Sequence, residues 1–257
     1  MLVIKTAGEI ELIRESSLLV SKTLAVVAEM IKPGITTLAL DRRSEEYIRD
    51  NNAKPGFKGY RGYPATLCTS VNSEVVHGIP SNYELKEGDI VSVDGGVIKN
   101  GFSGDSAYTF AVGEISKEAK GLLKATKESL FEGINNAVTG KRLGDISNAV
   151  QIYCESRGYS VVREMVGHGI GKNLHEEPEV PNYGRKGNGI QLKKGMVLCI
   201  EPMINQGKRF IVQDKDGWTI RTKDNTFSAH FELTVNIDND KADKLSTFNY
   251  IEEILNR

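Results

Sequence analysis

Carboxylates and histidines recur in this chain at positions whose spacing could assemble a metal site. Asp94 and Glu201 each end a mostly apolar run that follows the sequence Leu-Lys-x-Gly. A His-Gly-Ile triplet precedes each of these runs, beginning at His77 in the first and at His168 in the second. The duplicated phrase predicts two related halves, each with a strand that ends in an acid near a histidine. If the halves face one another, these oxygen and nitrogen donors converge.

Two further acids occupy positions that strand geometry could bring to the same place. Asp105 lies eleven residues after Asp94, and Asn100-Gly101 between them is a hairpin-turn sequence. Such a hairpin would put both carboxylates side by side on one face of a sheet. Close carboxylates repel each other unless a proton or a cation lies between them. Glu232 lies in a later strand, where it would share a face with His230.

Each of these residues also has a simpler interpretation. A single acid in a strand is usually solvated or caps a turn, and Asp105 alone could be a turn residue. Glu201 is harder to explain in this way, because four apolar residues precede it and a buried acid needs a partner. A lone histidine is more often structural than ligating. The four histidines nevertheless all lie within or beside the acidic segments, which favours a shared site: His77, His168, His175 and His230.

The donor set limits the metal and the reaction. Three or four carboxylates with one histidine and no thiolate favour Mn, Fe(II), Co or Zn in a hydrolytic site over a structural zinc. Five protein ligands, four of them anionic, suit a pair of divalent ions that lower the pKa of a bridging water and polarise a carbonyl. The residues alone therefore predict metal-assisted hydrolysis.

Composition excludes several other classes of protein. The 257 residues carry a formal net charge of −1, so no overall basic field points to nucleic acid or to a membrane. Three cysteines without C-x-x-C spacing (Cys68, Cys154 and Cys199) predict neither a disulfide framework nor a thiolate zinc site. The N-terminus has no long apolar stretch, and no segment approaches the length that spans a membrane. We expect a soluble cytoplasmic protein.

The elements that must position these residues follow one order twice. A capping box, Thr6 to Glu9, begins a helix that Pro33-Gly34 ends, and a second helix starts after Thr36 or Thr37 and runs to Asn51-Asn52. Two later helices are expected at 117–137 and 143–157. Strands are expected at 66–71, 90–97, 106–112, 159–164, 196–200, 218–222 and 230–235. Helices followed by strands, twice over, predict an α+β fold with helices on a curved antiparallel sheet. We expect one domain, 1–257, with pseudo-symmetric halves of about 1–112 and 113–257.

At these residues the chain resembles the type I methionine aminopeptidases of the pita-bread metallohydrolase superfamily. The resemblance covers essentially the whole chain. The absence of a Cys/His-rich stretch before Met1 and of a long insertion between His175 and Glu201 resembles the short bacterial form. The motifs that carry the resemblance are Val76-His77-Gly78-Ile79-Pro80, Val93-Asp94, Gly104-Asp105, Gly167-His168-Gly169-Ile170-Gly171, His175-Glu176-Glu177-Pro178, Ile200-Glu201-Pro202-Met203, Asp216-Gly217-Trp218-Thr219 and Phe231-Glu232.

The resemblance implies removal of the N-terminal methionine from nascent proteins and peptides with a small second residue. A water activated between two divalent ions would attack the scissile carbonyl. Glu201 would exchange protons with this water, His175 would hydrogen-bond the scissile carbonyl and stabilise the tetrahedral intermediate, and His77 would contact the substrate near the scissile bond. The implied metal ligands are Asp94, Asp105, His168, Glu201 and Glu232, of which Asp105 and Glu232 would bridge the ions.

The same resemblance implies a methionine pocket that involves Tyr60, Tyr63, Cys68 and Trp218. Aromatic faces and a thiol suit a polarisable thioether. Each aromatic could instead belong to the ordinary core, and Cys68 could be a small buried hydrophobe. The resemblance also implies nascent chains as partners, with transient contact to the ribosome, and we expect a monomer.

The chain departs from the usual pattern at four positions. Arg61 lies between the pocket tyrosines, often a histidine position, and Leu174 stands where an aromatic residue often precedes His175. Leu233 follows Glu232 where a histidine is usual. His230 stands two residues before Glu232, often a glutamine position; it could be exposed, an extra ligand, or a partner of a ligand, and we favour a partner.

Two other functions have to be weighed. A proline-specific member of the superfamily, an Xaa-Pro aminopeptidase or prolidase, usually carries an additional N-terminal domain. A non-catalytic pita-bread module would bind peptides or a partner protein, but loss of ligands would be expected of it, and all five implied ligands are present.

Overall fold

A computed structural model describes residues 3–256 of the chain. Thr6 forms the expected capping box with Glu9 and begins the first helix. The four long helices pack in two pairs, α1 with α2 and α3 with α4. The helices are α1 (Ala7–Met30), α2 (Thr37–Asp50), α3 (Lys117–Ile134), α4 (Leu143–Glu155), α5 (Asn249–Leu255) and a short 3₁₀ helix, η1 (Tyr60–Gly62).

The strands form one large antiparallel sheet and two small ones. The large sheet has the order β1-β4-β5-β14-β9-β7-β8, with β2 also paired to β4 and β15 to β14. The small sheets have the orders β13-β10-β6 and β11-β12-β3. The strands are β1 (Lys54–Pro55), β2 (Leu67–Val71), β3 (Glu74–Val76), β4 (Ile90–Lys99), β5 (Phe102–Ala111), β6 (Ser160–Val161), β7 (Gly167–Gly169), β8 (Glu176–Val180), β9 (Val197–Ile200), β10 (Met203–Asn205), β11 (Ile211–Gln213), β12 (Ile220–Thr222), β13 (Ser228–His230), β14 (Glu232–Asn236) and β15 (Asp243–Lys244).

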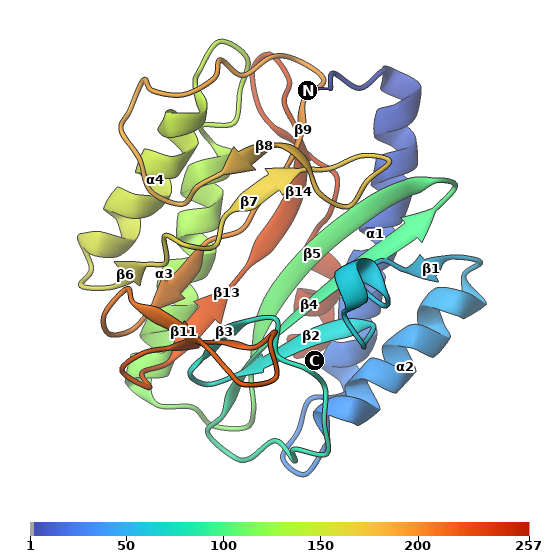
Figure 1. Cartoon of the computed structure of the whole chain (residues 1–257), viewed down its shortest axis with the longest axis vertical. Helices are drawn as coiled ribbons and strands as arrows, with labels where there is room; N and C mark the ends of the chain where they lie inside the picture. Colours follow the sequence, from blue (N-terminus) through green and yellow to red (C-terminus); the bar gives the residue numbers. More distant parts are fainter. Residues whose placement is uncertain (1–2, 257) are drawn as a thin grey trace.

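The centre of the large sheet joins the two halves of the chain. The duplicated phrase forms β4 in the first half and β9 in the second, and these strands flank the central pair β5 and β14. Helices α1 and α2 lie beside the first half and α3 and α4 beside the second (Figure 1). The expected α+β fold, with helices packed on an antiparallel sheet, is confirmed by this arrangement.

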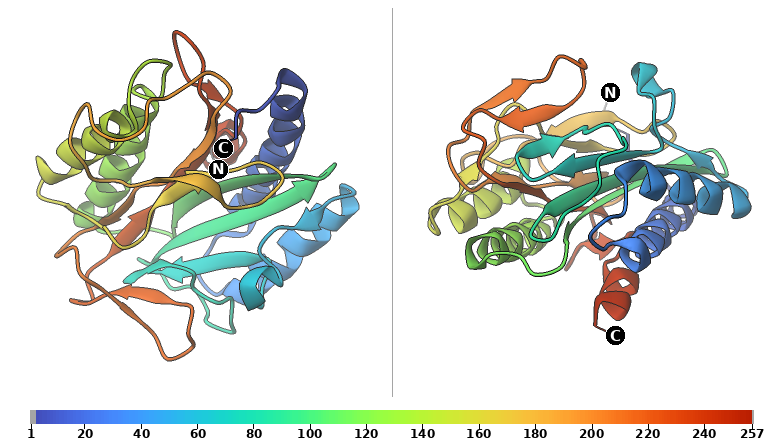
Figure 2. Two further views of the ribbon diagram at one scale, coloured as in Figure 1. Left: turned by 45° about the horizontal axis from the view of Figure 1, so that its top comes forward. Right: turned by 90° about the horizontal axis from the view of Figure 1, so that it is seen from below.

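The large sheet lies between the helices and the small sheet β11-β12-β3, whereas the other small sheet, β13-β10-β6, contacts α3 and α4. Helices α1, α3 and α5 lie on one side of the large sheet, while the strands around β11 and β3 lie on the other (Figure 2). Val93, Ile200 and Leu233 face the helices and join the main apolar core. Because strand residues alternate between faces, the neighbouring Asp94 and Glu232 face away from the helices.

Most of the expected elements are confirmed, with three informative differences. The expected strand 230–235 is interrupted at Phe231, whose amide donates to the Pro202 carbonyl, so β13 and β14 belong to different sheets. The strand expected at 159–164 is shorter in the structure and consists of the two residues of β6. After β6, the Val162 amide makes one more backbone hydrogen bond, to the Met203 carbonyl. The short strands β7 and β8, rich in glycine and charge, carry no alternating apolar pattern and were not predicted.

Candidate metal centre and active site

Five neighbouring strands bring the expected metal ligands into one row. Asp94 on β4 is paired with Ala107 on β5, and Ala107 is in turn paired with Glu232 on β14. Asp105 is two residues from Ala107 and therefore points to the same face. On the other side of β14 lies β9, and Glu201 follows the last residue of this strand. Strand β9 also pairs with β7, where His168 lies opposite Cys199. The hairpin thus places Asp94 and Asp105 diagonally on one face, as neighbours rather than as a directly opposed pair.

The row is buried and its carboxylates lack partners. Asp105, His168 and Glu232 each expose less than a tenth of their surface. One oxygen each of Asp94, Asp105 and Glu232 is buried without a hydrogen-bond partner among the described residues. Ligand atoms of Asp105, His168 and Glu232 lie within 4.8 Å of one another. Buried carboxylate oxygens that no protein donor satisfies are costly, so this donor set fits divalent cations.

Burial and mutual repulsion disfavour ionised carboxylates at this site. Burial raises the pKa of Asp105 well above its usual range, and the charges of Glu232, Asp94 and Glu201 raise it further. Burial followed by the charges of Glu201 and Asp94 likewise raises the pKa of Glu232 well above its usual range. The pKa of Asp94 rises to about 6 through burial, against the opposing influence of His230. A cation among these groups would reverse this effect and hold all of them ionised.

Glu201 lies between two imidazoles. Its Oε1 is 3.7 Å from Nε2 of His168, and its Oε2 is 3.3 Å from Nε2 of His230. His230 is 1% exposed, which rules out the solvent-exposed alternative for this residue. Its contact with Glu201 agrees with the favoured interpretation, in which His230 interacts with a side chain that binds metal. Burial and the Asp94 charge raise the pKa of Glu201 well above its usual range.

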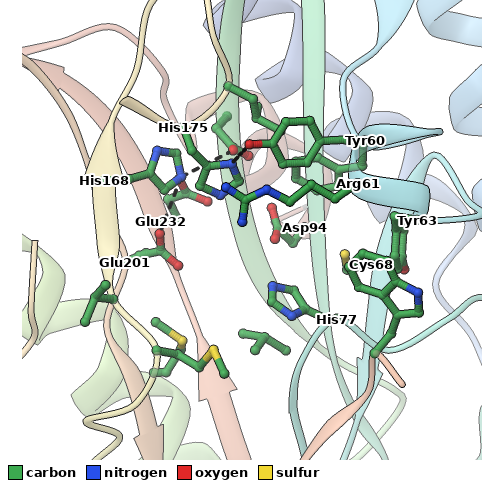
Figure 3. Close-up of a pocket in the computed structure, with 18 of the residues that line it drawn as sticks. Tyr60, Arg61, Tyr63, Cys68, His77, Asp94, His168, His175, Glu201 and Glu232 are labelled. Carbon is green, nitrogen blue, oxygen red and sulfur yellow. Dashed lines mark hydrogen bonds and ion pairs between the residues drawn. The ribbon is translucent and has the colours of Figure 1, made fainter. Parts of the chain in front are cut away.

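His175 is held at the edge of this row by aromatic rings. Its Nδ1 is 3.0 Å from the Tyr60 hydroxyl, and the two rings stack with centroids 5.2 Å apart. The His168 ring lies 4.1 Å away on the metal side. Burial, with smaller contributions from His168, Arg61 and His77, lowers the pKa of His175 to about 3. The ring is therefore neutral near pH 7, with Nε2 free toward the cavity (Figure 3).

An ion pair links the loop before His175 to the start of the chain. Lys5 donates to Oε2 of Glu176, while Oε1 of Glu176 accepts from the Asn173 amide. The Lys5 and Glu176 side chains are 4% and 11% exposed. The backbone amide of Lys5 donates to the carbonyl of Gly195, just before β9. The segment that carries His175 is thus tied through Lys5 to the N-terminal segment, which also bonds to the turn before β9.

A cavity of about 240 Å³ opens beside the row of ligands. All four expected pocket residues line it, together with His77. Tyr63 and Trp218 pack edge to face, and the Tyr63 hydroxyl lies 3.0 Å from the carbonyl oxygens of both Leu67 and Gly78, which share its single donor proton. Cys68 on β2 pairs directly with Asp94 on β4, so the pocket adjoins the expected metal site. The expected pocket residues form one apolar cluster that also contains Phe57 and Leu174: Tyr60, Tyr63, Cys68 and Trp218.

The structure also places residues in the site that the sequence did not indicate. The Cys199 thiol lies within the same 4.8 Å group as Asp105, His168 and Glu232. The two-residue repeat of a strand could have predicted its position, because it places Cys199 on the same face as Glu201. Burial first, and then the charges of Glu232 and Asp105, raise the pKa of this thiol well above its usual range. The Cys199 sulfur lies 3.5 Å from the Thr234 hydroxyl, and we retain the carboxylates and His168 as the candidate ligands.

The cavity has a second, sulfur-rich side that was also not predicted. Met165, Val166 and Met203 line it, and Met165 and Met203 pack in a small apolar cluster with Val76. Of the positions that depart from the usual pattern, Arg61 and Leu174 line the cavity as well. Leu233 faces the helices and belongs to the main core.

These features can be set against known proteins. Over residues 11–239 the chain matches Metallopeptidase family M24. The chain belongs to this family. A methionine aminopeptidase of Clostridium acetobutylicum is 54% identical over 238 residues, which are 92% of this chain and 95% of that protein. The resemblance carried by the motifs is thereby confirmed, and the chain is an enzyme of the aminopeptidase class.

Solved structures of the M24 family agree with this assignment. Methionine aminopeptidase from Thermotoga maritima superposes with a TM-score of 0.95 at 44% identity, covering 96% of this chain and all of that chain. An Xaa-Pro dipeptidase from Bacillus anthracis superposes with a TM-score of 0.75 at 20% identity, covering 95% of this chain but 62% of that chain. The second similarity shows the shared pita-bread fold. Within residues 3–256, no helix has the length and apolar character that crossing a membrane requires.

Proposed function

We propose that this chain removes the N-terminal methionine from nascent proteins and peptides whose second residue is small. The observation that carries the proposal is the convergence of four carboxylates, three of them buried, and His168 beside a cavity lined by aromatic and sulfur-containing side chains. The methionine aminopeptidases that resemble the chain along nearly its whole length support it.

We assign two divalent ions to the row of ligands. Asp94, Asp105, His168, Glu201 and Glu232 would hold them, with Asp105 and Glu232 shared between the ions. The partnerless carboxylate oxygens and the close approach of Asp105, His168 and Glu232 support the assignment. Ions of the group Mn, Fe(II), Co and Zn would supply an activated water and polarise the scissile carbonyl.

Glu201 is the residue that we assign to proton transfer. Its Oε1 faces His168 on the metal side, while its Oε2 faces His230. The carboxylate can accept a proton from the attacking water and return it to the leaving amine.

We assign the two other histidines of the cavity to the substrate. With the Tyr60 hydroxyl donating to Nδ1 of His175, the single proton of the neutral ring resides on Nε2. That Nε2–H can donate to the oxygen of the scissile carbonyl as negative charge develops on it. His77, whose pKa burial lowers to about 4, is likewise neutral and would contact the substrate near the scissile bond.

The methionine side chain would enter the cluster formed by Tyr60, Tyr63, Cys68 and Trp218. These residues line the cavity on the side of Asp94, within one apolar cluster. Polarisable ring faces and a thiol contact a thioether favourably. The Cys68 thiol stays neutral, because burial and the Asp94 charge raise its pKa well above the usual range.

A proline-specific peptidase is the rival function within the fold. The Xaa-Pro dipeptidase that shares the fold is longer, since this chain covers 62% of it, and its identity of 20% supports no closer relation. We therefore keep methionine release as the conclusion and use the rival as an outcome of the test.

The test measures hydrolysis of Met-Gly-Met and of Xaa-Pro peptides with and without a chelator. We expect methionine release from Met-Gly-Met that chelation abolishes and that Mn, Fe(II), Co or Zn restores. Release of the residue before proline, without methionine release, would assign the chain to the proline-specific enzymes. No metal-dependent hydrolysis of either substrate would indicate a binding module.

The setting of the enzyme follows from the same proposal. We propose a single catalytic domain, 1–257, with halves of about 1–112 and 113–257, that acts in the cytoplasm as a monomer. Its substrates would be the N-termini of nascent proteins, met through transient contact with the ribosome. Sedimentation with purified ribosomes, with and without a nascent chain, measures that contact.

A further inference from the structure

Arg61 is a cation at the mouth of the cavity, and the proposed reaction assigns it no role. It lines the cavity and extends from its turn toward His175 (Figure 3). Its guanidinium lies over the Tyr60 ring, 5.3 Å from the ring centroid. Among residues 3–256, no carboxylate forms an ion pair with it and no acceptor hydrogen-bonds it. A guanidinium has five N–H donors in a planar arrangement that matches the two oxygens of a carboxylate. These donors are therefore available to bind a ligand.

The backbone that carries Arg61 is fixed in place. Arg61 itself adopts a left-handed conformation, φ 50°, in η1. The turn is closed by hydrogen bonds from Gly59 to the Tyr63 carbonyl and from Tyr63 to the Tyr60 carbonyl, at 2.8 and 2.9 Å. Left-handed backbone is uncommon for a residue with a side chain. The side chain therefore starts from a rigid base, which lowers the entropic cost of binding a partner.

The position of Arg61 relative to His175 determines which residue of a bound substrate Arg61 can contact. In the proposed function, on which this inference rests, Nε2 of His175 contacts the scissile carbonyl, and the methionine side chain lies in the cluster near Asp94. The Arg61 side chain extends from η1 toward His175 across the cavity (Figure 3). The chain beyond the scissile bond leaves through the mouth, at about 3.3–3.6 Å per residue if extended. Its second residue must be small, so the next side chain is the first that can extend toward Arg61.

We propose that Arg61 selects substrates that carry an acidic side chain at the third residue. The guanidinium would bind that carboxylate while the Tyr60 ring supports its other side. The pair forms at the rim, where solvent screens it, so its contribution is modest: a preference of about three- to fivefold for glutamate over glutamine. The preference weakens as salt is raised, because screening acts strongly on charges at a surface.

The test compares kcat/KM on C-terminally amidated Met-Ala-Glu-Ser-Ser and Met-Ala-Gln-Ser-Ser with the metal-loaded full chain. Arg61→Gln should bring the ratio of the two values to about one, while Arg61→Lys should keep part of it. Arg42→Gln is the matched control, because it removes one exposed arginine from α2, outside the cavity. A ratio near one in the unaltered protein, or an equal loss in Arg42→Gln, would overturn the inference, as would an unchanged ratio in Arg61→Gln.

A binding measurement separates this inference from the proposed function. Trp218 is the single tryptophan of the chain and lines the cavity, so its fluorescence reports occupancy. Titration with the product peptides Ala-Glu-Ser-Ser and Ala-Gln-Ser-Ser, both amidated, reads the same preference without hydrolysis. If no peptide releases methionine but the acidic one still binds several-fold more tightly in an Arg61-dependent way, the proposed function fails and the inference stands. Equal binding of the two product peptides would reject the inference even if methionine is released.

Discussion

At the scale of single residues, the position of His175 depends on Tyr60. The hydroxyl of Tyr60 meets Nδ1 at 3.0 Å, and its ring stacks on the imidazole. His175→Ala should lower kcat about 10²- to 10³-fold, as loss of one donor to a developing oxyanion does. Tyr60→Phe keeps the stacking and removes only the hydroxyl, so a smaller loss, about tenfold, is expected. Steady-state kinetics on Met-Gly-Met measure both effects, and an effect confined to KM would contradict the role of His175.

The carboxylates can be tested at the same scale by isosteric amides. Asp105→Asn and Glu232→Gln each keep the shape of the side chain but remove an anionic ligand from the row. Each should abolish activity and reduce the divalent metal bound from two ions toward one, with the fold retained. Metal analysis of protein purified without oxygen measures the stoichiometry, and circular dichroism measures the fold. Full activity in either variant would refute a site with two shared carboxylates.

At the scale of elements, the packing of α1 against β5 supports the site from behind. A Cβ at Gly104 would lie 2.3 Å from the amide nitrogen of Ser17 and 2.5 Å from the carbonyl carbon of Ser16. Both contacts are with helix backbone, which cannot rotate away as a flexible side chain could. Gly104 also precedes Asp105, so the helix and the ligand cannot move independently.

Gly104→Ala should therefore destabilise the fold by about 1–3 kcal/mol, the usual cost of overpacking. Gly8→Ala is the control, because nothing lies within 4 Å of a Cβ at that position in α1, and alanine favours a helix. Urea unfolding of both variants gives the free energies. Equal stability of Gly104→Ala and the unaltered chain would mean that α1 does not hold β5 in place.

The same elements explain what the sequence could and could not predict. The helices and the β4–β5 hairpin carry strong local signals, such as the capping box at Thr6 and the turn at Asn100-Gly101, and they are confirmed. The interruption at Phe231 has no local signal, because it depends on the carbonyl of Pro202. The acids Asp94 and Glu232 stood out because charge is rare in apolar strands. Cys199 gave no such signal, because a cysteine in the apolar run before Glu201 is not distinguishable from its apolar neighbours.

At the scale of the whole molecule, metal loading should control how stability depends on pH. When all four are ionised, the buried carboxylates Asp94, Asp105, Glu201 and Glu232 carry the charge that two divalent ions would balance. Without metal, the folded state raises their pKa values, so it binds more protons than the unfolded chain above pH 4. Their contribution to stability therefore falls as pH rises.

The histidines of the site act in the opposite direction over a narrower range. Burial lowers the pKa of His77 and His168 to about 4. The folded state then binds fewer protons than the unfolded chain between about pH 4 and 6.5, so this contribution to stability rises with pH and is complete by about pH 7. Below pH 6.5 the two effects oppose each other. Above pH 7 the carboxylates act in the same direction as the buried thiols of Cys68 and Cys199, whose pKa values burial also raises.

We therefore expect the metal-free chain to lose more stability than the metal-loaded chain as pH rises above 7, because bound cations hold the carboxylates ionised. Asp105→Asn removes one of the mutually repelling charges. It should make the metal-free chain more stable at pH 8, because burial and the neighbouring acids raise the pKa of Asp105, and it should flatten the pH dependence of the stability. Urea unfolding at several pH values, with chelator and with metal, measures these differences. If the metal-free chain were as stable at pH 9 as at pH 7, the row of buried acids would not repel as its geometry requires, and the electrostatic reason for a metal at this site would be lost.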